Sequence, residues 1–224
     1  MDWSALWLSV RLAAIVAAIL LVIGLPLAHW LTFSRRRWKF LVESIVSLPL
    51  VLPPTVLGFY LLLALGSQSP IGRWWMAWTG RGLAFTFESL VIASIFYSLP
   101  FAVQPIAASF SQVDHTLHEA SATLGASPLR TFVRVTLPLS IEGIVAGVVL
   151  SFAHTIGEFG VVLMVGGNLP GITRTVSISI YEHVQALEYR QANAMALLLL
   201  LFSFLVLMTV HALRRRPWAA APIT

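Results

Sequence analysis

The chain of 224 residues contains no cysteine, and only 10% of its residues are charged. The missing cysteine excludes a disulfide framework, a thiolate metal site and a cysteine nucleophile. The low charge excludes an ordinary soluble domain, in which roughly 25% of residues are charged. With 58% hydrophobic residues and a mean hydropathy of +0.87, the composition is that of an integral membrane protein.

A nucleotide-binding loop is also missing. Such a loop needs G-x-x-x-x-G-K-[ST], and the chain's one lysine is Lys39 in RRRWKF. The chain therefore cannot bind ATP by that route, and any ATP energy must reach it through a partner protein. We expect a non-catalytic protein with no cofactor and no bound metal.

Charged pairs inside the apolar runs and inverted repeats are absent as well. Both are typical of ion-coupled secondary transporters, so that class is disfavoured, although it remains an alternative. The basic residues gather at the ends of apolar runs and form no nucleic-acid-binding face. No small-residue cleavage site follows the first run, so we expect the first segment to remain in the mature protein.

Five stretches are long enough to cross a bilayer, which needs about 20 apolar residues. They lie near residues 6–29, 44–65, 87–109, 139–163 and 192–213. Prolines 49, 53 and 54 interrupt the second stretch, which should therefore kink or begin as a short interfacial turn. The sequence predicts an all-α protein with one transmembrane domain, residues 1–224, and about five membrane-spanning helices.

The distribution of lysine and arginine predicts the orientation. Nine of these residues fall on one side of the membrane and four on the other, with Arg11 inside the first run. Because positive charge accumulates in the cytoplasm, we place the N-terminus outside and the C-terminus inside. External loops then span about 66–86, where Trp74, Trp75 and Trp78 indicate an aromatic belt, and 164–191.

The polar stretch HEASATLGASPLRTFVRVTLPLS lies in the largest predicted cytoplasmic loop, about 110–138. Apolar residues at helical spacing predict a first short helix, which Gly125 should end in a left-handed conformation. Ser127 and Pro128 form a start signal for a second short helix, a capping hydroxyl followed by proline. Pro138 should open the next span. From this pattern alone, an amphipathic loop lying passively on the membrane explains the stretch equally well.

The spacing resembles the EAA loop of ABC importer permeases. That pattern reads E-A-A, three residues, G, nine residues, I, one residue, L-P; here Ser121 replaces the second alanine and Val135 the isoleucine. The resemblance implies a type I ABC importer permease fold in which this loop docks into a groove of a separate ATPase subunit. The coupling residues that it implies are Glu119, Ala120, Ser121, Gly125, Leu137 and Pro138.

The run 139–163 carries a second ordered pattern. Gly143, Gly147, Ser151 and Thr155 recur every four residues, and Glu158 continues that face. Small residues at this spacing allow helices to pack closely in membranes. They could also line a translocation pathway between two copies of the chain, and the two interpretations are compatible. Glu158 could cap backbone groups or act in gating.

His154 lies in the same run, without a second histidine at ligand spacing on that helix. We therefore expect it to pack or form hydrogen bonds, and we expect no metal site. Since no basic residue other than Arg11 lies within a predicted span, an oxyanion would find no strong trap there. Selectivity would then come from an external binding protein.

Several further stretches of the sequence indicate which group of ABC importer permeases the chain resembles. SLPLVLPPTVLGFYLLL (47–63), SPIGRWW, HEASATLGASPLRTF and residues 154–185 together resemble molybdate ABC transporter permeases. The resemblance implies a multi-pass permease of the bacterial plasma membrane that works as a homodimer with two ATP-binding subunits and an extracytoplasmic molybdate-binding protein. Sulfate permeases are similar around GEFG and the EAA loop, and tungstate is indistinguishable from molybdate, so a sulfate or tungstate permease remains an alternative.

Overall fold

The computed structural model describes residues 2–214, which form helices and connecting turns without any strand in that range. The helices, in chain order, are α1 (Trp3–Phe33), α2 (Lys39–Ser47), η1 (Leu48–Leu50), α3 (Pro54–Leu65), α4 (Pro70–Thr79), α5 (Phe87–Ser111), α6 (His115–Thr123), α7 (Pro128–Thr131), η2 (Phe132–Thr136), α8 (Leu137–Leu139), α9 (Ile141–Gly157), α10 (Gly160–Gly166), α11 (Val176–Gln185) and α12 (Tyr189–Arg214).

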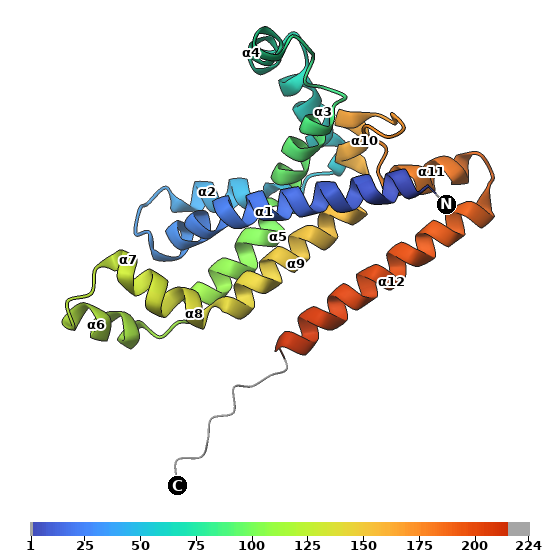
Figure 1. Cartoon of the computed structure of the whole chain (residues 1–224). Helices are drawn as coiled ribbons and strands as arrows, with labels where there is room; N and C mark the ends of the chain where they lie inside the picture. The colour runs from blue at the N-terminus through green and yellow to red at the C-terminus, as the bar shows by residue number, and fades with distance from the viewer. Residues whose placement is uncertain (1, 215–224) are drawn as a thin grey trace.

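Three long helices, α1, α5 and α9, pack side by side and form the centre of the molecule (Figure 1). Leu12, Val16 and Leu20 of α1 are fully buried in a cluster with Leu90 of α5. Helix α12 also packs against α9, but most of its described apolar side chains are exposed. An apolar surface of this kind suits contact with lipid.

The structure allows up to five spans, the number that the sequence predicts. Three helices, α1, α5 and α12, are individually long and apolar enough to cross a membrane, and there are up to five spans if each of two bent helix pairs counts as one. The first bent pair joins Lys39–Leu50 to Pro54–Leu65 at 111°. Pro53 and Pro54 lie at this bend and offer no N–H groups to a continuous helix, so the predicted kink is confirmed.

The fourth span differs from its prediction at both ends. The chain bends by 71° between Pro128–Leu139 and Ile141–Gly157, so α9 begins at Ile141 and Pro138 does not open the span. Helix α9 ends at Gly157, before the predicted end at residue 163, and a separate helix α10 follows. The reason is tertiary packing: α10 lies against α3, where a Cβ on Gly58 would lie only 2.8 Å from Cβ of Met164.

The coupling segment, which we define as α6 to α8, lies at one end of the bundle beside the end of α1 (Figure 1). The N-terminus and α11 lie at the opposite end. This separation agrees with the predicted arrangement of loops, while the side that faces the cytoplasm stays a prediction. The extreme C-terminus, predicted to be cytoplasmic, lies outside the described residues.

Helices α4 and α11 occupy segments that the sequence predicted as external loops. Ser69 caps α4 by accepting a hydrogen bond from the Gly72 amide at 2.8 Å. Trp74 and Trp78, one turn apart, stack on each other with centroids 5.9 Å apart and are mostly exposed. Their role in an aromatic belt stays a prediction.

Candidate functional site

The first helix of the coupling segment, α6, begins and ends at local hydrogen-bonding motifs. The Asp114 carboxylate accepts a hydrogen bond from the Thr116 amide at 2.9 Å. Hydrogen bonds from the Thr116 backbone and side chain hold the pKa of Asp114 below its ordinary value. At the other end Gly125 has a φ of +76°, and the Ala126 amide donates to the Ser121 carbonyl. This Schellman motif satisfies the last carbonyls of the helix and confirms the predicted stop.

The second helix, α7, begins as the sequence predicts. The Ser127 hydroxyl accepts a hydrogen bond from the Arg130 amide at 3.3 Å, and Pro128 occupies the first helical position. The helix then widens into a π-helical turn, η2, before the short helix α8. Local side-chain chemistry therefore marks the division of this segment into two helices.

An apolar surface covers the outside of the coupling segment. Leu124 is 87% exposed and Leu129 is 72% exposed, and Leu117 is also exposed. Glu119, Ala120 and Gly125 are exposed as well. The leucine at 129 was not singled out by the sequence analysis; its place one residue after the start proline of α7 is the signal that could have found it. Large exposed apolar side chains with polar residues around them are characteristic of an interaction surface.

Other predicted coupling residues point toward the body of the segment. The Ser121 hydroxyl lies 2.7 Å from that of Thr131 and joins α6 to α7. Leu137 packs against the cluster that contains Phe110 and Ile144, and Pro138 is exposed. The six predicted coupling residues therefore fall into two groups. Ser121 and Leu137 hold the segment in place. The exposed residues, which are available to a partner, are Glu119, Ala120, Gly125 and Pro138.

The small residues of α9 face α5. A Cβ on Gly147 would lie 2.7 Å from the Ala102 carbonyl oxygen, so the two backbones approach closely. Ser151 and Thr155 are buried, and the Thr155 hydroxyl lies 2.9 Å from that of Ser98 on α5. Close packing within one chain accounts for these positions. Their place on a translocation pathway stays a prediction.

Glu158 follows α9 and does not continue its helical face. It is 5% exposed and lies at the break before α10, where Oε1 accepts a hydrogen bond from the Val162 amide at 3.2 Å. Its Oε2 accepts one from the Ser94 hydroxyl at 3.3 Å. The backbone-capping interpretation is therefore observed directly, and the gating interpretation stays a prediction.

His154 packs and forms a hydrogen bond, as expected. Its Nδ1 lies 3.0 Å from the Ser98 hydroxyl, and its ring stacks on Phe101 with centroids 3.9 Å apart. No group of three or more potential ligands that could hold a metal occurs among the described residues. His154, Glu158, Tyr97 and Thr55 line a largely apolar cavity of about 530 Å³ at the break between α9 and α10.

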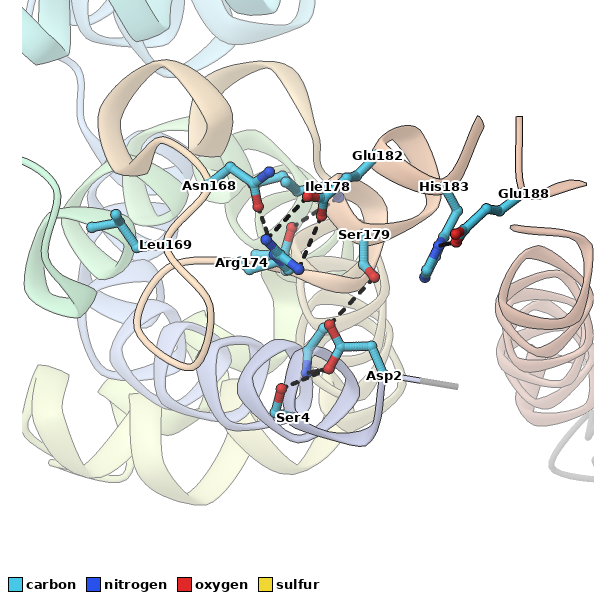
Figure 2. A network of polar contacts seen from close by, with 12 residues as sticks. Asp2, Ser4, Asn168, Leu169, Arg174, Ile178, Ser179, Glu182, His183 and Glu188 are labelled. Atoms are coloured by element: carbon cyan, nitrogen blue, oxygen red, sulfur yellow. Dashed lines mark hydrogen bonds and ion pairs between the residues drawn. The ribbon is translucent and has the colours of Figure 1, made fainter. Parts of the chain in front are cut away.

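At the opposite end of the bundle, polar contacts fix the segment between α10 and α11 (Figure 2). Arg174 forms two contacts with the Glu182 carboxylate at 3.0 and 3.1 Å and donates to Asn168 Oδ1 at 2.6 Å. Asp2, which caps α1, accepts a hydrogen bond from Ser179 of α11 at 3.4 Å. The start of α1 and the segment 168–182 are thereby connected.

Burial and hydrogen bonding have opposite effects on the pKa of Asp2. Burial raises the pKa of the Asp2 carboxyl, but hydrogen bonds from Ser4, Ala5 and Ser179 and the charge of Arg174 outweigh it. The net result is a pKa below the ordinary value of 3.8. The cap is therefore ionised at neutral pH and joins the network with a full negative charge.

Comparisons with known proteins show which proteins this chain is similar to. The sequence model described as "Binding-protein-dependent transport system inner membrane component" matches residues 11–218. The molybdenum transport system permease protein ModB of Azotobacter vinelandii is 49% identical over 215 residues, covering 96% of this chain and 95% of that protein. The protein of the same name from Escherichia coli K12 is 37% identical, covering 82% and 80%.

Solved structures agree on the fold. A bacterial ABC transporter involved in the import of the acidic polysaccharide alginate matches with a TM-score of 0.75 at 18% identity, covering 96% of this chain and 79% of that one. The MetNI methionine ABC transporter in an inward-facing conformation matches with a TM-score of 0.70 at 17% identity, covering 94% and 93%. At these identities the likeness establishes the type I ABC importer permease fold.

Proposed function

This chain belongs to the binding-protein-dependent transport system inner membrane component family, and from that premise we propose that it is the permease subunit of an ATP-driven molybdate importer. It is a multi-pass protein of the inner membrane and a transport component rather than a catalyst. The finer features below, namely the ATPase partner, the homodimer, the binding protein and the cargo, are parts of this proposal.

The ATPase docks on the coupling segment. The observation that carries this assignment is the exposed apolar surface formed by Leu117, Leu124 and Leu129. A short helix with such a face fits a groove on another protein. Glu119, which is exposed and lies 3.1 Å from His115 Nδ1, offers a charge at the rim of the contact. Ala120 and the glycine at 125 lie on the same exposed surface, where small residues allow close approach.

Two copies of the chain form the passage. We place it beside the break between α9 and α10, at the cavity of about 530 Å³ that Glu158 helps to line. Gly147 and Thr155 hold α9 against α5 on the way to this break, so that a tilt of one helix moves the other, and Ser151 between them is buried. ATP binding would bring the two coupling segments together and open the passage outward, and hydrolysis would reset it.

An extracytoplasmic binding protein delivers the anion at the opposite end. Residues 66–86 and 164–191 would form its docking surface. The ion pair between Arg174 and Glu182 supports this role because it holds the second segment in a defined shape. Fixed loops reduce the ordering cost of binding a partner.

The cargo is assigned from likeness alone. The relative from Azotobacter vinelandii, named as a molybdenum transport permease, is 49% identical over nearly the whole chain. Uptake by the reconstituted complex, with molybdate, tungstate and sulfate in competition, tests this assignment. We expect molybdate and tungstate to compete with each other and sulfate to compete weakly. A preference for sulfate would overturn the cargo and leave the permease assignment intact.

A pull-down with this chain as bait tests the transport class. We expect an ATP-binding ABC subunit to be retained. If no ATPase is retained and a proton or sodium gradient drives uptake, the chain is an ion-coupled secondary transporter and the proposal is wrong.

A further inference from the structure

Aromatic rings form a continuous chain between the coupling segment and the long helices. His118 of α6 lies against Phe33 at the end of α1, with ring centroids 5.3 Å apart. Phe33 lies 4.8 Å from His29, and His29 lies 4.7 Å from Phe132 of η2. Phe132 in turn contacts Phe110 of α5 at 5.7 Å. The chain therefore joins α6, α1, η2 and α5: η2 contacts His29 directly, and α6 reaches it through Phe33.

Helix α6 has few other attachments to the molecule. None of its residues is classed as buried, and its hydroxyl contact, from Ser121 to Thr131, joins it to α7 rather than to a membrane-spanning helix. Its outer face carries Leu117, and Leu124 follows immediately at its C-terminal end; both are proposed to dock on the ATPase. Movement of α6 thus reaches α1 through the contact between His118 and Phe33.

The rings surround a cavity of about 310 Å³. Two buried polar atoms at its wall, Nε2 of His118 and Oγ1 of Thr136, have no hydrogen-bond partner among the described residues. Buried polar groups are nearly always paired, so these two atoms distinguish this region from most of the described chain. The cavity lies beside the rings and extends to the exposed residues Ala122 and Pro128, so the ring contacts themselves form the direct link between α6 and α1.

We propose that His118 and Phe33 are positioning residues that transmit movement of the coupling segment to α1 and, through His29 and Phe132, to α5. This inference rests on the proposed function, since it assumes that an ATPase moves α6. Rings in contact resist compression, so a displacement of His118 shifts Phe33. A small side chain at 118 would remove the direct contact between α6 and α1 and leave the longer route through α7 and Phe132. ATP hydrolysis would then be coupled less tightly to transport.

The ratio of anion imported to ATP hydrolysed, measured with the reconstituted full complex, tests the proposal. In His118→Ala we expect this ratio to fall by about fivefold or more, within the usual range of coupling between sites, while ATPase association and hydrolysis persist. His118→Phe keeps the ring and should restore the ratio. Trp38→Leu is the matched control, because it removes a ring that contacts Trp30 of α1 at 4.9 Å and that is not one of the rings in the chain from His118 to Phe110. It should leave the ratio unchanged.

Two outcomes would overturn the inference: an unchanged ratio in His118→Ala, or no restoration in His118→Phe. If His118→Ala fails to assemble, Phe33→Leu breaks the same contact from the α1 side and keeps an apolar side chain; it should lower the ratio in the same way. A complex with the unaltered chain that shows no ATP-driven uptake would refute the proposed function. Normal coupling in that complex and in both variants would refute this inference alone.

Discussion

The hydroxyl of Ser121 lies 2.7 Å from the hydroxyl of Thr131, and this contact joins the two short helices of the coupling segment. Thr131 is 8% exposed, so the bond is shielded from water on one side. The position of Ser121 in the EAA-like pattern is thus occupied by a residue that holds the segment together from inside, while Leu124 and Leu129 cover its outside.

Thr131→Val removes this bond at nearly constant volume. A typical hydrogen bond contributes about 1 kcal/mol, so amide exchange in α6 should quicken by about fivefold. Exchange in α9 should not change. Thr123→Ala is the control, because the Thr123 hydroxyl bonds the Glu119 carbonyl within the same helix. Equal exchange rates in the two variants would contradict the linking role of Thr131.

Gly125→Ala should weaken the turn between α6 and α7. At a φ of +76° a side chain meets backbone strain, although nothing lies within 4 Å of the added Cβ. The strain costs about 1–2 kcal/mol, and limited proteolysis at residues 124–127 should accelerate severalfold. Gly125→Asn should have a smaller effect. Gly82→Ala, where the space is equally open and φ is not in the left-handed region, should be neutral.

Gly147→Ala should destabilise the contact between α5 and α9. The new methyl group would lie 2.7 Å from the Ala102 carbonyl oxygen and 3.0 Å from Ile106. Overpacking of this kind costs about 1–3 kcal/mol, so the Tm of the purified protein in detergent should fall. Gly157→Ala adds a methyl group to open space and serves as the control. An unchanged Tm in Gly147→Ala would show that the helices separate easily.

The sequence predicted the coupling segment better than the ends of the spans, for a physical reason. The stop at Gly125 and the start at Ser127 and Pro128 depend on neighbours in the chain, so residue types reveal them. The break after Gly157 depends on α10 packing against α3, which lies about a hundred residues earlier in the chain. Gly157, Glu158 and Gly160 interrupt the apolar run at this point, but they do not reveal which helix α10 packs against. The stripe on α9 indicated close packing, but only the structure identifies α5 as its partner.

The stability that the Asp2 cap contributes at the start of α1 should decrease at low pH. The pKa of Asp2 is lowered below 3.8 in the folded protein, so its contribution is complete above that ordinary value and is lost as pH falls through the folded pKa. Asp2→Asn keeps the capping oxygen and loses the charge, which is worth about 0.5 kcal/mol at a helix N-terminus. The Tm difference between the two proteins should be constant from about pH 5 to 8 and should shrink as the pH falls below 3.8 and through the folded pKa. A difference that grows on acidification would contradict this sign.

Leu124→Asp tests the docking surface without disturbing the fold. Leu124 is 87% exposed, so the change should alter stability by no more than about 0.5 kcal/mol. Because it puts a charge into the proposed apolar contact, it should abolish retention of the ATPase in a pull-down. Leu187→Asp, at a 70% exposed leucine near the opposite end of the bundle, should retain the ATPase. Retention by both variants would place the docking surface elsewhere.

The most direct test of the whole account is molybdate accumulation in proteoliposomes that contain the complete complex. ATP is supplied only on the side of the coupling segment, and the binding protein only on the side of α11. The account predicts accumulation against a gradient that stops without ATP and is lost in Leu124→Asp. Accumulation that continues without ATP and follows an imposed ion gradient would contradict it.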